Sequence, residues 1–161
     1  MSNILANDFF DGGIGDGFGF TLIDPASIPV GGFSPVVTVF YGAGAGLTPG
    51  GLYYLDAAGT WTPTNATAVG AGNDEKLAIA MGATPASGMM TLGWWNIPVA
   101  VLDGAFAIGR FIWMSAAGNF QVATVQPVVL GNISRCVGES TTVANVAYFN
   151  PAGVWATSKG P

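Results

Sequence analysis

One pattern occurs twice in the chain, first as Gly51-Leu52-Tyr53-Tyr54-Leu55-Asp56-Ala57-Ala58-Gly59-Thr60-Trp61 and again as Gly109-Arg110-Phe111-Ile112-Trp113-Met114-Ser115-Ala116-Ala117-Gly118-Asn119-Phe120. Each copy reads as an aromatic and aliphatic strand, an Ala-Ala-Gly turn and another aromatic residue. Each then continues, after a polar span, into a strand of small residues that ends in glycine. The pattern predicts two similar β units, over about residues 51–83 and 109–141.

The spacing between the two copies is nearly constant. Ala57 lies 59 positions before Ala116, and the closing Gly82 lies 56 positions before Gly138. Small changes in loop length within a duplicated unit produce a drift of this size. Propellers and solenoids need three or more repeats, so two copies favour two half-barrels or two stacked sheets.

The chain outside the repeats also reads as β structure. Val36-Val37-Thr38-Val39-Phe40-Tyr41 predicts a strand, because every residue is β-branched or aromatic and Pro35 and Gly42 bound the run. Residues 89–102 predict two short strands interrupted near Gly93 and Pro98, and residues 143–149 predict another strand. Glycine and proline recur at the spacing of a sandwich or barrel, and no stretch has sustained helical periodicity. We expect an all-β body over residues 36–161, a small barrel or sandwich built from two similar β units.

Residues 1–35 differ in composition from this body. Glycines alternate with aromatic and acidic residues between Asp8 and Phe20, and so much glycine opposes helix formation. This stretch also contains too many phenylalanines for a solvated linker. We expect an extended arm that docks on a neighbouring subunit or on its own barrel, through Phe9, Phe10, Phe18 and Phe20.

Charged residues are scarce. Lys and Arg total 4 and Asp and Glu total 9, which is 8% of 161 residues, and 50% of the chain is hydrophobic. An ordinary soluble protein has about 25% charged residues. Obligate interfaces are depleted in charge, so we infer that other protein covers much of this surface. The aromatic residues that we expect at an interface between copies of the chain are Trp94, Trp95, Trp113 and Tyr148.

Two classes of partner are disfavoured. The net charge is −5 and the four cations are scattered, whereas binding to a phosphate backbone uses clustered cations. We therefore expect no nucleic-acid partner. No window of about 18 uncharged apolar residues exists, and the N-terminus lacks the basic and apolar regions of a signal peptide. We therefore expect no membrane partner.

Groups that perform chemistry are few. The chain has no histidine, which excludes Ser-His and Cys-His nucleophile pairs. The single Cys136 cannot form a disulfide within the chain, and its apolar strand suggests a small buried residue. The carboxylates Asp74 and Glu75 are adjacent, so on a strand they point to opposite faces. We predict no enzymatic activity, no cofactor and no metal site.

Specific residues resemble a known class of protein. Gly-x-x-Tyr-Leu-Asp-x-x-Gly-x-Trp from Gly51, followed by Ile79-Ala80-Met81-Gly82, is similar to β-rich virion proteins of tailed bacteriophages. The stretch from Arg135-Cys136-Val137-Gly138 to Val146-Ala147-Tyr148-Phe149-Asn150-Pro151 fits the same type. From about residue 50 to 156 the chain resembles capsid cement (decoration) proteins and some tail-fibre modules. The resemblance implies a small β-barrel or sandwich protein, a homotrimer, on the outside of a capsid.

The composition and the resemblance both favour a structural role. The expected function is that of a virion structural protein that decorates and stabilises a phage capsid by binding the outer face of the coat lattice. Its expected partners are the major capsid protein and other copies of itself, and the arm would lock over adjacent coat subunits. The alternative is a tail-fibre module that binds a receptor or a glycan, because exposed tryptophan and tyrosine rings stack on sugars.

Overall fold

The computed structural model describes residues 24–67, 75–117, 119–129, 131–151 and 156–157. These residues form β-strands and short 3-10 turns, with no α-helix among them, so the predicted all-β class is confirmed. The four phenylalanines of the expected arm precede residue 24 and lie outside the described residues.

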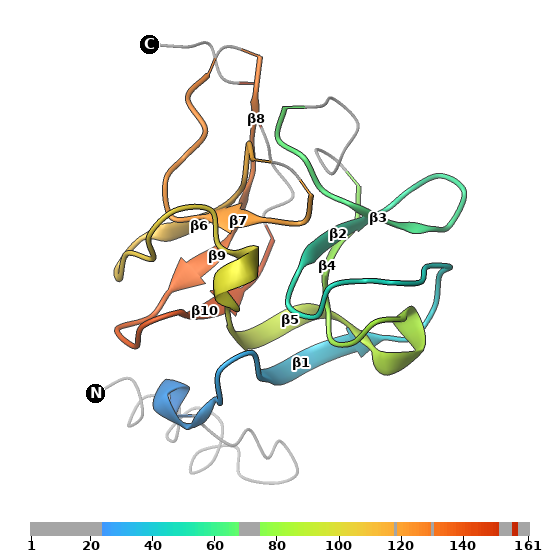
Figure 1. The fold of residues 1–161 in the computed structure, drawn as a ribbon, viewed down its shortest axis with the longest axis horizontal. Helices are drawn as coiled ribbons and strands as arrows, with labels where there is room; N and C mark the ends of the chain where they lie inside the picture. The colour runs from blue at the N-terminus through green and yellow to red at the C-terminus, as the bar shows by residue number, and fades with distance from the viewer. Residues whose placement is uncertain (1–23, 68–74, 118, 130, 152–155, 158–161) are drawn as a thin grey trace, which may run out of the picture.

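Nine strands form one antiparallel sheet in the order β3-β2-β4-β5-β10-β9-β6-β7, with β1 paired to β5. A separate pair joins β8 and β11. The strands are β1 (Phe33–Val39), β2 (Leu52–Leu55), β3 (Trp61–Pro63), β4 (Leu77–Ala80), β5 (Met89–Asn96), β6 (Phe111–Met114), β7 (Val122–Ala123), β8 (Ile133–Ser134), β9 (Cys136–Ser140), β10 (Val146–Phe149) and β11 (Ala156–Thr157). The 3-10 turns are η2 (Pro25–Ser27), η3 (Pro85–Ser87) and η4 (Val99–Val101). The sheet curls into a half-barrel (Figure 1).

Strand β5 connects the two halves of the sheet. On one edge β1 pairs with β5 from Met89 to Trp95. On the other edge β4 pairs with Met89 and Met90, and β10 pairs with residues 93–96. Strands β4 and β10 thus share one edge of β5 and diverge from it, and this divergence lets the sheet curl.

Gly93 permits this close pairing. We expected the chain to break near Gly93, but β5 runs through it. Its φ is 146°, and a Cβ at this position would lie 2.7 Å from the Ser34 carbonyl oxygen and 2.8 Å from the Pro35 Cα. Only glycine tolerates so near a backbone, so here glycine marks close approach of β1 rather than a strand end.

Strand β1 begins earlier than the sequence suggested. It starts at Phe33, inside the segment expected as an arm, and ends at Val39 instead of Tyr41. Pro35 lies within it, because β1 pairs on one side only and an edge strand tolerates a residue without a backbone N–H. The register shifts immediately after Pro35, between Pro35 and Val37.

The two predicted units have the same strand order. In the first, β2 lies between β3 and β4, and in the second, β6 lies between β7 and β9. When the two Ala-Ala-Gly turns are aligned, however, the matched residues of the preceding strands β2 and β6 lie on opposite faces of the sheet. Leu52 and Tyr54 pack on the main core, whereas their aligned partners Phe111 and Trp113 lie on the other side of the sheet. A shift of one residue in a strand exchanges its two faces.

The main core fills the inside of the curled sheet. Backbone hydrogen bonds outside the strands join the two halves across this core: Leu52 N donates to Phe120 O (2.9 Å), Ala66 N to Ser115 O (3.0 Å) and Ile133 N to Ala66 O (2.7 Å). The core residues are Leu52, Ala66, Leu77, Ile79, Met90, Trp95, Ile97, Val101, Ile112, Met114, Val122, Ile133, Val137, Ala147 and Phe149.

A second apolar cluster covers the outer face of the first half. Residues 41–50 pack there, and their backbone is held by the indole of Trp61, which donates to Tyr41 O (2.7 Å), and by the hydroxyl of Tyr53, which accepts from Thr48 N (2.8 Å). This segment therefore packs over Tyr53 and Trp61, while Phe40 and Tyr41 stay 67% and 46% exposed.

The repeated turn has the same anchoring chemistry in both copies. The Asp56 carboxylate accepts from Ala58 N (2.9 Å) and Thr60 N (2.9 Å), and at the aligned position Ser115 Oγ accepts from Ala117 N (2.9 Å). Short polar side chains commonly bond the backbone two residues on in this way. The backbone bond from Thr60, supported by further bonds, holds the pKa of Asp56 below its ordinary 3.8.

Asp56→Asn tests this turn, because asparagine keeps an oxygen acceptor and removes the charge. A carboxyl with a depressed folded pKa stabilises the fold above its ordinary pKa, and that stabilisation is lost as the pH falls through the folded value. Urea unfolding should therefore find Asp56→Asn less stable than the parent at neutral pH and equally stable in strong acid. A deficit of the same size at both pH values would contradict the role of the charge.

Candidate functional site

Three of the four residues predicted at an interface share the outer face of the sheet. Trp94 and Tyr148 are directly opposite each other on β5 and β10, with ring centroids 4.7 Å apart. Trp113 lies on β6, on the same face, opposite Cys136 of β9. All three side chains are partly exposed.

Trp95 lies on the other face. Its side chain is 0% exposed, and its ring meets Phe149 edge-on at 5.8 Å. Successive residues of a strand point to opposite faces, so Trp94 and Trp95 cannot belong to one surface. We expected Trp95 at an interface between copies, but the structure places its side chain in the core of the chain itself.

Phe111 extends this surface, and the sequence analysis did not single it out. It is 55% exposed, and its ring centroid lies 6.3 Å from that of Trp113. Glu139 of β9 is opposite Phe111 on one side and opposite Tyr148 on the other, which places all three on one face. We call Trp94, Phe111, Trp113 and Tyr148 the outer aromatic face. The period-two spacing of Phe111 and Trp113 was the signal that would have identified Phe111.

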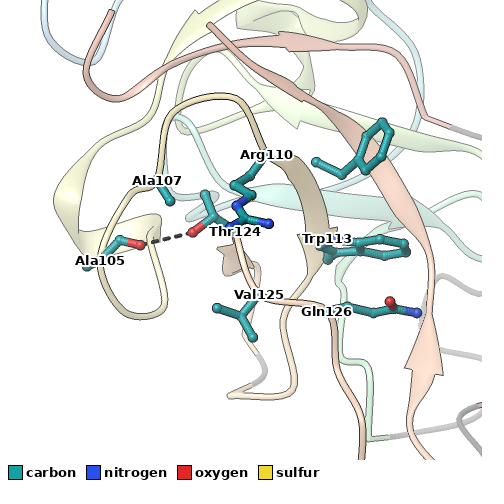
Figure 2. Close-up of a pocket in the computed structure, with 8 residues that line it drawn as sticks. Ala105, Ala107, Arg110, Trp113, Thr124, Val125 and Gln126 are labelled. Atoms are coloured by element: carbon teal, nitrogen blue, oxygen red, sulfur yellow. Dashed lines mark hydrogen bonds between the residues drawn. The ribbon is translucent and has the colours of Figure 1, made fainter. Parts of the chain in front are cut away.

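An open groove adjoins Trp113 and Phe111, with a volume of about 480 Å³. Figure 2 shows its two walls, joined where the Thr124 hydroxyl donates to Ala105 O (3.0 Å). Ala105 and Ala107 lie on one side of the groove, and Trp113 and Gln126 lie on the other (Figure 2). The lining residues are Ala105, Ala107, Arg110, Phe111, Trp113, Thr124, Val125 and Gln126.

Arg110 supplies a positive charge to this groove. Its backbone is fixed against β9, where Arg110 N donates to Ser140 Oγ (2.8 Å). Its exposed side chain extends into the groove (Figure 2), and no side chain among the described residues pairs with its guanidinium. The other described cations are engaged elsewhere: Lys76 donates to the Tyr41 hydroxyl (2.7 Å), and the buried Arg135 donates to Glu75 O (2.8 Å).

Cys136, Asp103 and Asp56 have side chains that can react or bind a metal, and each of them has a structural environment. Burial raises the pKa of the Cys136 thiol, which favours the protonated and unreactive form. Asp103 accepts from the Ser115 hydroxyl (2.6 Å), and Asp56 anchors its turn. No group of three or more potential metal ligands occurs within the described part of the chain, and Asp74 lies outside that part.

Comparison of the chain with protein-family models, with curated proteins and with solved structures gave no match. Among the described residues, no helix has the length and apolar character needed to span a bilayer. The properties of the outer aromatic face are therefore the basis for assigning a role.

Trp94 and Trp95 offer a matched pair of variants. Trp95→Ala removes a buried ring and should lower the free energy of unfolding by about 3–5 kcal/mol. Trp94→Ala truncates the neighbouring but partly exposed ring, so its cost should be smaller. Denaturant unfolding of both variants measures the difference. Equal losses would contradict the placement of Trp95 inside and Trp94 outside.

Proposed function

We propose that the protein is a structural assembly protein that binds other protein subunits through the outer aromatic face. The observation that carries this proposal is the exposure of large rings in a chain with 8% charged residues. Residues 41–50 pack over Tyr53 and Trp61 of the first half, and on the second half Phe111 is 55% exposed beside an open groove. Large aromatic residues with a polar rim are typical of the energetic centre of a protein interface.

Self-association fits the charges of this face. Arg110 and Glu139 line one depression together with Phe111. In a cyclic assembly, Arg110 of one copy can meet Glu139 of the next while the rings between them are buried. The sequence resemblance adds the number of copies, a homotrimer.

The place of assembly is proposed from the sequence resemblance. It is the outer surface of a bacteriophage capsid, where the protein would bind the major capsid protein and stabilise the coat lattice. Little charge and extensive apolar surface suit a subunit that is held between neighbours.

We also propose that residues 51–83 and 109–141 derive from one duplicated β unit, preceded by an extended arm. The shared strand order and the equivalent bonds of Asp56 and Ser115 support the duplication. On this proposal, the opposite orientation of Phe111 and Leu52 reflects a one-residue shift in register between the two units.

Phe111→Asp tests self-association. We expect sedimentation of the parent protein to give an oligomer mass, and the variant to dissociate at least tenfold more readily, since a charge would be buried at the contact. Val99→Asp is the control, because Val99 is 77% exposed and lies outside the outer aromatic face. A parent that sediments as a monomer, or equal weakening by both variants, would contradict the proposed interface.

A second candidate function is glycan binding by a tail-fibre module. It is favoured by the groove itself, where the flat ring of Trp113 lies with the polar groups of Arg110 and Gln126. Electron microscopy of virus particles labelled for this chain separates the candidates. Label over the capsid shell supports the cement role. Label at the tail, with glycan-array binding that Trp113→Ala abolishes, supports the second.

A further inference from the structure

The groove beside Trp113 has a definite chemical character. Its apolar lining comes from Trp113, Phe111 and Val125, with Val125 73% exposed, and Thr124 and Gln126 add polar groups. Arg110 adds one positive charge that forms no ion pair within the described residues, although Glu139 lines the neighbouring depression. A ligand that matches this groove has aromatic side chains next to carboxylates.

The chain itself contains such a ligand. Asp8-Phe9-Phe10-Asp11 places two adjacent rings between two carboxylates, and Asp16-Gly17-Phe18-Gly19-Phe20 repeats the combination. Residues 1–23 contain no lysine or arginine, so their charge is opposite to that of Arg110. Glycines between the rings leave room for the backbone to follow a groove.

The described chain starts at the same end of the sheet as Arg110. The Asn96 amide at the end of β5 donates to Ile28 O (3.2 Å). Asn96 pairs with Val146 of β10, the next residue Ala147 pairs with Ser140 of β9, and Ser140 N donates to Arg110 O (2.8 Å). The same end of the sheet thus holds both the chain that follows Asp24 and the part of the groove at Arg110.

The N-terminal segment is long enough to reach the groove. Strands β5, β10 and β9 separate β1 from β6, and a spacing of about 4.8 Å per strand makes that path about 19 Å. The chain from Phe10 to Asp24 spans up to about 45 Å when extended. A tethered ligand of this kind has an effective concentration of about millimolar, which favours its own groove over that of another copy.

We propose that residues 8–20 dock in the groove of their own chain, with phenylalanine rings over Trp113 and Val125 and a carboxylate paired with Arg110. Glu139 lines a neighbouring depression together with Arg110 and Phe111. The docked segment covers part of the outer aromatic face. A subunit that binds to this face competes with the docked segment. This competition rests on the proposed function, whereas the docking itself does not.

Photo-crosslinking of the full chain tests the docking. Phe10 is replaced by p-benzoylphenylalanine, the protein is irradiated and digested, and crosslinked peptides are identified by mass spectrometry. Crosslinks to residues 105–113 and 124–126 are expected. An equal mixture of 15N-labelled and unlabelled protein should give crosslinked pairs from one isotope only. Absent or scattered crosslinks overturn the proposal, and pairs of mixed isotope overturn docking within one chain.

Matched charge variants test the role of Arg110. Arg110→Glu should lower the crosslinking yield about two- to fivefold, the effect of losing an exposed ion pair. Lys76→Glu changes the net charge equally on the other half of the sheet and should leave the yield unchanged. Asp11→Arg combined with Arg110→Glu should restore part of the yield. Equal losses in Arg110→Glu and Lys76→Glu would show a general charge effect and contradict the site. The oligomer mass is measured separately, so failure here leaves the self-association test unaffected.

Discussion

The pairing around β5 is the constraint on which the structure depends. One strand holds β1 along one edge and divides its other edge between β4 and β10. Gly93 makes this possible, because a side chain there would collide with the backbone of β1. The division turns the two halves of the sheet toward each other. Their inner faces then bury a single core, and main-chain hydrogen bonds near Ala66 join the halves across it.

The same constraint explains why the two outer faces differ. The chain entering β2 crosses the outer face of the first half and packs on Tyr53 and Trp61. The chain entering β6 forms one wall of a groove and leaves Phe111 exposed. On a chain with so few charged residues, an exposed aromatic surface of this kind marks a site where another molecule binds. The exposed Phe111 beside this groove is therefore the main structural argument for a binding surface.

The sequence predicted many elements correctly, and its errors have physical causes. Strands were expected where β1, β2, β6 and β10 occur, because β-branched and aromatic runs between glycines and prolines are a local signal. The expected break at Gly93 was wrong, since a glycine that ends a strand and one that admits a neighbouring strand look alike in sequence. Phe111 was missed as a surface residue because only tryptophan and tyrosine rings were expected at an interface, although its position two residues before Trp113 puts it on the same face of the strand.

The sequence alone determined the β class, the turn at Ala57-Ala58-Gly59 and the absence of histidine chemistry, because these depend on residue type and on neighbours within a few positions. Only the tertiary structure decided which face of each strand is inside. Because side chains alternate along a strand, Trp94 and Trp95 must lie on opposite faces, and so must Phe111 and Ile112. This alternation does not show which residue of each pair is in the core. That assignment follows from how the sheet curls and closes, which depends on contacts between residues far apart in the chain.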